Sequence, residues 1–359
     1  MPTFAKKQLI TKTAIMIKAS LATLSLAIMT LIASAEQIYI NIKTGNDANP
    51  GTQSQPLKTL QTAAKKINAN KQPEATTVFL SEGVYQLTET ILIDNNKFTQ
   101  ENRLIIRAEI GPDDPNWNPQ RMPVIVTPPP IPYKDEEWAR GLKIEASHVT
   151  IEGLRFSVSP TYYYIDGKHS RCSYPIFREG KTLDDLLITQ CLFAGDADLL
   201  PVRVAVIANG HGLVLDHCVF YHCENSVVFW DAEDGTSHHN AMRYCLVNGG
   251  HYTGVWTTKS TADDFEFHHN IIANSTTGWI KEGDHHYSIH DCIFTGNTSQ
   301  AKTGTDTGPK TSSSLDFLQM ENVQTTGTIE IEKDQSKNNY LQLKDGSFGS
   351  TLNTGLFKK

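Results

Sequence analysis

A short pattern recurs six times through the middle of the chain and limits what it can fold into. Each copy has an apolar residue, a small residue three positions later and a second apolar residue two positions after that. The copies are Ile151-Leu154-Phe156, Ile188-Cys191-Phe193, Leu215-Cys218-Phe220, Met242-Cys245-Val247, Phe267-Asn270-Ile272 and Ile289-Cys292-Phe294, spaced by 37, 27, 27, 25 and 22 residues. A repeat of about 20 to 30 residues with short β-branched and aromatic runs predicts a β-solenoid in which each copy belongs to one coil.

Four of the six cysteines occupy the small-residue position of this pattern, and Asn270 occupies it in the fifth copy. Free cysteine packs as a small hydrophobic residue. A column of inward-facing side chains therefore explains these cysteines better than a disulfide framework does. Cys172 and Cys223 lie outside the column, and a disulfide between them stays open for an exported protein.

The first 35 residues have the pattern of a secretory signal peptide. They carry Lys6, Lys7, Lys12 and Lys18 and no acid, then an apolar stretch at 21–32 and the small residues Ala33-Ser34-Ala35. This order predicts cleavage after the small residues, with a retained N-terminal anchor as the alternative. No other stretch approaches the ~20 apolar residues that span a bilayer. We therefore expect a secreted or periplasmic protein with no membrane span after cleavage.

The expected mature chain is acidic. The whole sequence has a net charge of −7, and loss of residues 1–35 leaves 28 basic against 39 acidic side chains, a net charge of −11. Such a balance argues against a nucleic-acid partner. We expect one domain over residues 36–359, because a solenoid lengthens without splitting, and we expect it to be a monomer.

Composition divides this domain into four parts. Residues 36–75 predict a strand and an amphipathic helix that begins near Pro56 and caps the open end of the solenoid. Residues 76–297 predict the coils, interrupted at 111–140 by a stretch rich in Pro and Trp. Residues 298–314 predict a polar loop, and residues 315–359 the last coils and a C-terminal cap.

The opening YINIKTGNDANPGTQSQPLKTLQTAAKKI, followed by VFLSEGVY, resembles the start of many secreted right-handed parallel β-helix proteins, among them polysaccharide lyases and glycosidases. Together with the repeats, this resemblance implies an all-β fold, a right-handed parallel β-helix with an N-terminal capping helix. The same scaffold carries lyases, hydrolases, epimerases and binding proteins, so function has to be argued from a site.

A second row of strands precedes the repeats and ends in polar residues. Stacked on neighbouring coils, these residues are expected to form one ionisable stripe on the outside, although a solvated charged face is the alternative. Trp230, Trp256 and Trp279 flank the stripe and could hold sugar rings or serve as packing residues. The candidate substrate-binding residues are Arg178, Trp230, Trp256, Glu282, Asp284 and His285.

Residues 258–297 resemble the catalytic region of the chondroitinase B and alginate lyase family. That family has a Lys-Ser pair, an Asn on the coil and a basic residue in an Arg-His-Gly type of turn; the matching positions are Lys259-Ser260, Asn270 and the run 281–285. The resemblance implies that Lys259 is the proton-abstracting base and that Lys281 stands in place of a catalytic arginine. Lysine lacks the planar fork of arginine, which is a departure from the family.

The same family places acidic calcium ligands shortly before its lysine, where this chain has no carboxylate. Calcium would therefore need Asp231, Glu233 and Asp234 one coil earlier, together with Asn209. Three carboxylates within four residues and an amide oxygen suit a hard cation such as Ca²⁺.

These residue types fit β-elimination across a uronic acid. The reaction removes a weakly acidic C5 proton while a cation neutralises the adjacent carboxylate. A lysine beside a second cation has a lowered pKa, and Lys259 and Lys281 on consecutive coils are expected to form such a pair. The leading hypothesis is a lyase that cleaves a uronic-acid-containing polysaccharide.

Two alternatives remain. A β-helix glycoside hydrolase would need two carboxylates about 5 to 9.5 Å apart, with candidates in Asp231 or Asp234 and Glu282 or Asp284. A non-catalytic carbohydrate-binding or surface protein would keep the scaffold without turnover.

Histidines occur in adjacent pairs, among them His268-His269. Neighbours in a strand point to opposite faces, so such a pair is not expected to present both rings to one metal, and no zinc site is predicted.

Overall fold

A computed structural model of the chain describes residues 35–71, 74–133, 136–160, 171–180, 183–196, 199–200, 202–231, 235–304 and 311–358. The chain divides into two units, Met1–Ala35 and Glu36–Lys359, and the fold is that of the second unit. The predicted signal peptide lies outside the described residues except for its last position.

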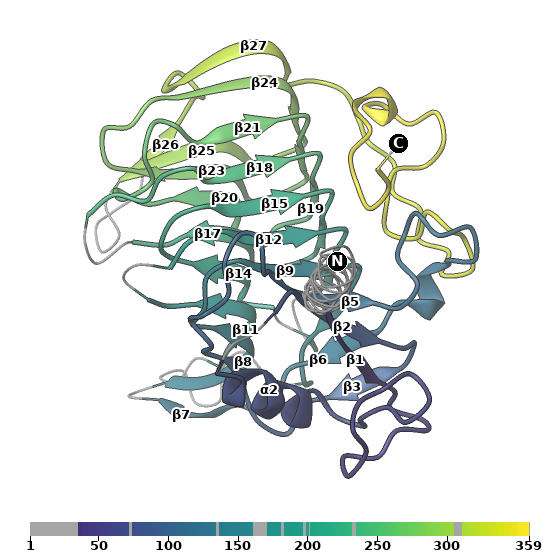
Figure 1. Cartoon of the computed structure of the whole chain (residues 1–359). Coiled ribbons are helices and arrows are strands. Elements are labelled where there is room, and N and C mark those ends of the chain that lie inside the picture. The colour runs from purple at the N-terminus through teal and green to yellow at the C-terminus, as the bar shows by residue number, and fades with distance from the viewer. Residues whose placement is uncertain are drawn as a thin grey trace, which may run out of the picture. The chain divides into compact units, whose positions relative to one another are not determined.

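Each regular coil contributes one strand to each of three rows. One coil is formed by β12 (Leu186–Thr189), β13 (Leu192–Ala194) and β14 (Val204–Ala208), and the next coil begins with β15 (Leu213–Asp216). Every strand of these coils pairs in parallel with the equivalent strand one coil away. The stack of rows in Figure 1 is therefore a right-handed parallel β-helix, as predicted.

The first and second rows together form one extended sheet, which we call sheet A. Its first row contains β1 (Glu36–Ile40), β2 (Thr76–Leu80), β5 (Leu104–Ala108), β9 (Val149–Glu152), β12, β15, β18 (Ala241–Arg243), β21 (Glu266–His268), the start of β24 (Tyr287–Thr295) and the start of β27 (Leu318–Gln324). Its second row contains β3 (Val84–Gln86), β6 (Val124–Val126), β10 (Arg155–Ser157), β13, β16 (Val219–Tyr221), β19 (Leu246–Asn248), β22 (Ile271–Ala273) and the ends of β24 and β27.

The third row is a separate sheet, sheet B. It contains β4 (Ile91–Ile93), β8 (Glu136–Ile144), β11 (Arg171–Arg178), β14, β17 (Asn225–Phe229), β20 (Thr253–Thr257), β23 (Thr277–Glu282) and β25 (Ser299–Gly304). Two antiparallel strands extend it, β7 (Ile131–Tyr133) beside β8 and β26 (Thr311–Ser313) beside β25.

The sequence repeat predicted the register of sheet A residue by residue. The first apolar positions pair coil to coil, as Ile151 with Ile188 and Ile188 with Leu215, and the last positions do the same. Inside the helix, Phe193 stacks on Phe156 with 5.0 Å between ring centroids and on Phe220 with 4.9 Å. The column of small residues is buried, and all six cysteines are free thiols, Cys172 and Cys223 included.

A bend separates the two rows of sheet A, and one residue of each bend has a left-handed backbone conformation. The residue just before each small residue has a positive φ, as in Gly153 at 69°, Gln190 at 52° and His217 at 51°. At the Asn270 coil the side chain serves the bend directly, since its Oδ1 accepts from the Cys245 amide at 2.9 Å and its Nδ2 donates to the Met242 carbonyl at 2.7 Å. We call this bend the sheet A corner.

The capping helix is α2 (Leu60–Ala69), which lies at the end of the stack where the described chain begins (Figure 1). It begins later than predicted, after the N-cap Thr59, because Leu57 still pairs with Ile40 in a β-bridge and Asp47 accepts from the amides of Lys58 and Thr59. Its buried face covers the core with Leu60, Ala63, Ala64 and Ile67. Within the described ranges, no helix has the length and apolar character that a bilayer crossing needs.

Three segments differ from the predicted organisation. The stretch 298–314, expected as a polar loop, contains β25 and β26. The stretch 111–140 is not one excursion, because it contains β6, β7 and the start of β8. Beyond β27, the chain forms a short 3₁₀ turn at Ser350–Leu352 and packs along the outside of the second row, where Tyr340, Leu341 and Leu356 join a cluster with Leu246 and Ile271. The end of the chain therefore covers a side of the helix, as Figure 1 shows in yellow.

Candidate functional site

The loops after β17, β20 and β23 hold most of the predicted site. We call residues 230–231, 258–264 and 281–286 the sheet B edge. The loops lie directly against one another, because a Cβ atom added to Gly283 would be 3.2 Å from the Cα atom of Lys259. Gly283 has a φ of +73°, which favours glycine where the two backbones meet.

Lys259 is exposed, while Thr258 and Ser260 on either side of it are buried. Ser260 fixes the loop from below, because its Oγ donates to Asp231 Oδ1 at 3.2 Å. His285 fixes it from above, because its Nε2 lies 2.8 Å from the Lys259 carbonyl. Among the residues that the structure describes, none forms an ion pair with the Lys259 ammonium. The Lys259 side chain therefore extends from an ordered backbone.

His285 connects two loops of the sheet B edge. Its Nδ1 lies 2.9 Å from Asp263 Oδ1, so both ring nitrogens face oxygens that only accept hydrogen bonds. The imidazolium form can donate to both. The hydrogen bond from His285 lowers the pKa of Asp263 below its ordinary value. His285 therefore has a positioning role in this structure, and its contact with a substrate stays a prediction.

Lys281 does not lie on the outer stripe where it was expected. It shares strand parity with Trp279, which is fully buried, and it is itself only 7% exposed. Its Nζ lies 5.4 Å from the centroid of the Phe317 ring. Burial lowers the pKa of Lys281, an effect that Asp284 and Asp263 oppose.

The expected stacking of Lys259 on Lys281 is wrong in register. Lys281 pairs with Thr257, two residues before Lys259, and Gly283 is the residue that meets Lys259. The strand pairing therefore does not support the expectation that Lys281 lowers the pKa of Lys259 from the neighbouring coil.

Arg178 also points into the helix, at the position that Lys281 occupies in a later coil. Arg178 pairs with Ala208, and Ala208 pairs with Phe229, whose row continues through Thr257 to Lys281. Arg178 is 1% exposed, and its guanidinium donates to the carbonyls of Asn209 at 2.6 Å and His211 at 2.9 Å. Burial lowers its pKa to about 10. These contacts hold the loop after β14 and place Arg178 inside the helix, away from any surface that a polymer could reach.

The predicted calcium ligands are only partly described. Asn209 is 4% exposed, and its Oδ1 accepts from the Gly180 amide at 3.0 Å. Since Ala208 pairs with Phe229, Asn209 stands level with Trp230 and not with Asp231. Glu233 and Asp234 lie outside the described residues. The calcium set therefore stays a prediction that rests on Asp231, which is half-buried.

The outer face of sheet B carries a group that the sequence analysis identified only in part. Trp256 Nε1 donates to Glu282 Oε1 at 3.0 Å, and its ring lies 5.9 Å from that of Tyr252. Burial raises the pKa of Tyr252, and the carboxylates of Glu224 and Glu282 raise it further. We call Glu224, Tyr252, Trp256 and Glu282 the outer aromatic patch.

The sequence analysis did not identify Glu224 and Tyr252, although the strand register could have indicated them. Each stands one residue before the paired positions Asn225 and Thr253, so the strand register brings them level. The remaining predicted residues flank the patch and the edge: Trp230 is half-buried after β17 and packs on an apolar cluster of sheet B, and Asp284 is exposed after β23.

No protein-family model matches the chain, and no curated protein matches it. Solved structures do, at low identity. A GH136 lacto-N-biosidase from Eubacterium ramulus is 9% identical with a TM-score of 0.49, covering 84% of this chain and 70% of that one. A rhamnogalacturonan lyase is 14% identical with a TM-score of 0.36, covering 90% and 100%.

The pectin methylesterase from Aspergillus niger is 10% identical with a TM-score of 0.39, covering 90% and 95% of the two chains. These neighbours are enzymes named for pectin or other glycans, but likeness this weak carries no argument about what this chain does. The fold is established by the strand pairing itself.

Proposed function

We propose that the chain is a secreted polysaccharide-active enzyme that cleaves a uronic-acid-containing polymer by β-elimination at the sheet B edge. The observation that carries the proposal is Lys259, an exposed lysine without an ion-pair partner among the described residues, held on a backbone that Asp231 and His285 fix from adjacent coils. A base must be accessible, and the exposed Lys259 extends from a backbone that hydrogen bonds hold in place.

The polymer would run over the outer aromatic patch toward this edge. Trp256 is half-buried beside a buried carboxylate, so its ring orientation is set before a ligand arrives. A ring held in place loses little conformational entropy when a sugar packs on it. The patch and the edge share β20 and β23, which places binding and chemistry on one pair of strands.

The cation that neutralises the uronate carboxylate is not Lys281, since that amine points inward. Calcium, bound beside Asp231, would supply this neutralisation. Asp231 offers a half-buried carboxylate whose Oδ1 already accepts from Ser260. Activity that requires added Ca²⁺ and is lost with a chelator would support this part of the proposal.

The test is the ultraviolet absorbance of the unsaturated uronide product, measured on alginate, pectate and glycosaminoglycans with Lys259→Ala beside the wild type. Lys65→Ala is the matched control, because Lys65 is an exposed lysine of α2 at the far end of the stack. We expect a rise in absorbance that Lys259→Ala abolishes and Lys65→Ala leaves intact. An undiminished rise in Lys259→Ala would contradict the assignment of the base.

A second reaction is favoured by one observation, the two carboxylates of the outer aromatic patch. Glu282 accepts a hydrogen bond from Trp256, whose ring lies 5.9 Å from that of Tyr252, and Glu224 stands level with Tyr252 in the strand register. Paired carboxylates are what glycoside hydrolysis requires. New reducing ends without ultraviolet absorbance, lost in Glu282→Gln, would identify this reaction in place of elimination.

A chain that binds one of these polymers without either product would be a carbohydrate-binding protein. Binding by isothermal titration calorimetry that Lys259→Ala leaves unchanged, with no product over a long incubation, would give that result.

A further inference from the structure

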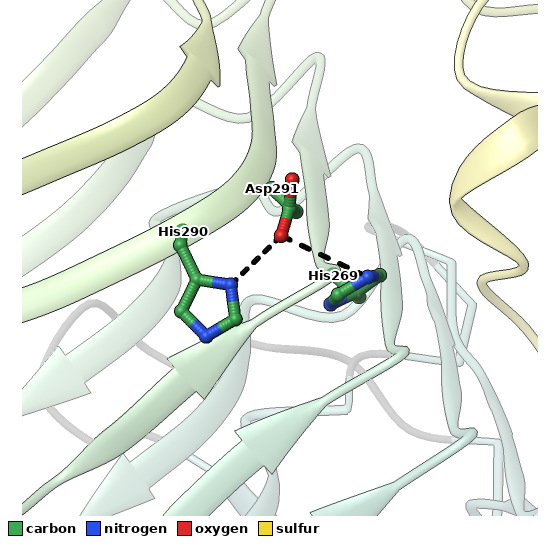
Figure 2. A group of neighbouring side chains, drawn as sticks. All are labelled: His269, His290 and Asp291. Carbon is green, nitrogen blue, oxygen red and sulfur yellow. Dashed lines mark hydrogen bonds and ion pairs between the residues drawn. The ribbon is translucent and has the colours of Figure 1, made fainter.

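A second cluster of ionisable side chains lies on the sheet A corner of the last coils, away from the sheet B edge. His269, His290 and Asp291 each place one ligand atom within 4.8 Å of the others. Figure 2 shows Asp291 between the two imidazole rings. Its Oδ2 is 2.8 Å from His290 Nδ1 and 3.9 Å from His269 Nε2.

The corner explains why adjacent histidines can act together here. His268 ends β21, and His269 follows with a φ of 51°, so the strand alternation is broken between them. The two Nδ1 atoms are 3.0 Å apart. The prediction that such a pair points to opposite faces is therefore wrong at this position, because a left-handed bend replaces the second strand residue.

Hydrogen bonds select the ligating tautomer of His269. His268 Nε2 lies 2.8 Å from the Glu266 carboxylate, which only accepts, so this nitrogen carries the hydrogen. His268 Nδ1 in its neutral form then accepts from His269 Nδ1, and the lone pair of His269 is left on Nε2, the atom that faces Asp291. A carboxylate–histidine chain behind a metal-ligating histidine is the usual arrangement of outer partners at metal sites.

The other two ligands are also held from behind. Asn322 Nδ2 donates to Asp291 Oδ1 at 2.5 Å, leaving Oδ2 toward the histidines. His290 stacks on His268 at 4.8 Å, and His269 packs against Tyr244 at 4.7 Å. The three side chains remain 29%, 48% and 31% exposed for His269, His290 and Asp291, so an ion can reach them from solvent.

We propose that His269, His290 and Asp291 bind a divalent transition metal of the Zn²⁺ class, with water completing the coordination. Two imidazoles and one carboxylate suit Zn²⁺ and its first-row neighbours better than Ca²⁺, which prefers six or more oxygen ligands. Coordination through His290 Nδ1 requires the neutral tautomer with its hydrogen on Nε2, so Nδ1 gives up a proton to solvent and Nε2 takes one up when the ion binds. The metal would link the corner after β21 to β24, and the site is independent of the reaction proposed for the sheet B edge.

The test is isothermal titration calorimetry of the full protein without a histidine tag, after dialysis against a chelator, with Zn²⁺, and visible absorption with Co²⁺ as the spectroscopic probe. We expect saturable binding of one Zn²⁺ and little response to Ca²⁺. His290→Ala and Asp291→Asn should each weaken Zn²⁺ binding by roughly tenfold or more, since each removes a ligand. His286→Ala is the matched control, an exposed histidine that directly precedes β24 and is not one of the three ligands.

A second readout separates coordination from a structural effect of the substitutions. Zn²⁺ should raise the unfolding temperature of the wild type and of His286→Ala, and leave that of His290→Ala unchanged. Absence of saturable Zn²⁺ binding in the wild type, or equally tight binding in the two ligand variants, would overturn the proposal.

Discussion

The sheet A corner and the sheet B edge are two bends of the same coils, and they differ in regularity. At the corner, one left-handed residue followed by one small buried residue recurs from Gln190 to Asp291 with φ between 51° and 53°. At the edge, the loops differ in length and contacts from coil to coil, and glycine is needed where Gly283 meets Lys259. Packing in the core maintains a corner that every coil repeats, whereas a bend that varies from coil to coil can carry binding or catalytic residues.

The largest expected effect separates the two regions by stability. Phe193→Ala removes the middle ring of the fully buried stack of Phe156, Phe193 and Phe220 and should cost about 3–5 kcal/mol in the free energy of unfolding. Lys259→Ala at the edge should change it by less than about 0.5 kcal/mol, because the side chain is exposed. Urea unfolding followed by circular dichroism measures both. Equal losses in the two variants would show that the edge is as structural as the corner.

Asn270→Ala tests the corner through its hydrogen bonds. It leaves the Cys245 amide and the Met242 carbonyl without their buried partner, which should cost about 2–3 kcal/mol. Asn270→Cys matches the residue that the other coils use and offers a weak S–H donor, as Cys218 does to the Ile188 carbonyl at 3.4 Å. Its loss of unfolding free energy should therefore be smaller, and a Cys variant worse than the Ala variant would contradict this reading of the column.

Trp256→Ala tests whether the outer aromatic patch beside the sheet B edge binds the polymer. Loss of the half-buried ring should weaken binding of an oligouronate roughly tenfold, which is about 1.4 kcal/mol. Trp256→Phe keeps an aromatic surface and loses only the hydrogen bond to Glu282, so it should lose less. Tyr39→Ala, which removes a ring stacked on Phe79 in the first coils, is the control. Equal affinity of Trp256→Ala and wild type, by calorimetry, would remove the outer aromatic patch from the binding surface.

Lys281→Met gives the smallest effect, on the order of 1 kcal/mol or less. Burial holds the pKa of Lys281 below its ordinary value, so the unfolded chain binds more protons than the folded one between those two pKa values. The stability of the wild type should therefore rise with pH through that alkaline window. At neutral pH the charged amine disfavours folding, and Lys281→Met should unfold at a slightly higher temperature.

Thermal unfolding at several pH values provides the check. The advantage of Lys281→Met should shrink as the pH rises and the wild-type amine loses its proton. An advantage that grows with pH would mean that the Phe317 contact and the nearby acids outweigh burial.

The sequence predicted the fold and the core far better than the site, for a physical reason. Inward apolar residues recur at the same place in every coil, so the repeat predicted the pairing of Ile188 with Leu215 directly. The site depends on which residues of each strand point inward and which point outward. The predicted stripe took all polar residues near the strand ends as outward, and so it grouped the inward Arg178 and Lys281 with the outward Trp256 and Glu282. Parity could have been assigned from Trp279, whose buried ring shares the side of Lys281.

Other features have no signal in sequence spacing. The helix α2 begins at Leu60 because Leu57 forms a bridge with Ile40, a contact between distant segments. The link between His285 and Asp263 depends on two loops of adjacent coils meeting. The histidine cluster depends on a left-handed corner at His269, which breaks the strand alternation from which we expected no zinc site.

Hydrogen–deuterium exchange with mass spectrometry, with and without an oligouronate under conditions of slow turnover, tests most directly where the ligand binds. We expect slower amide exchange confined to 252–264 and 281–286, with the corner segments 188–193 and 215–220 unchanged. Unchanged exchange at the sheet B edge, or protection concentrated at the sheet A corner, would contradict it.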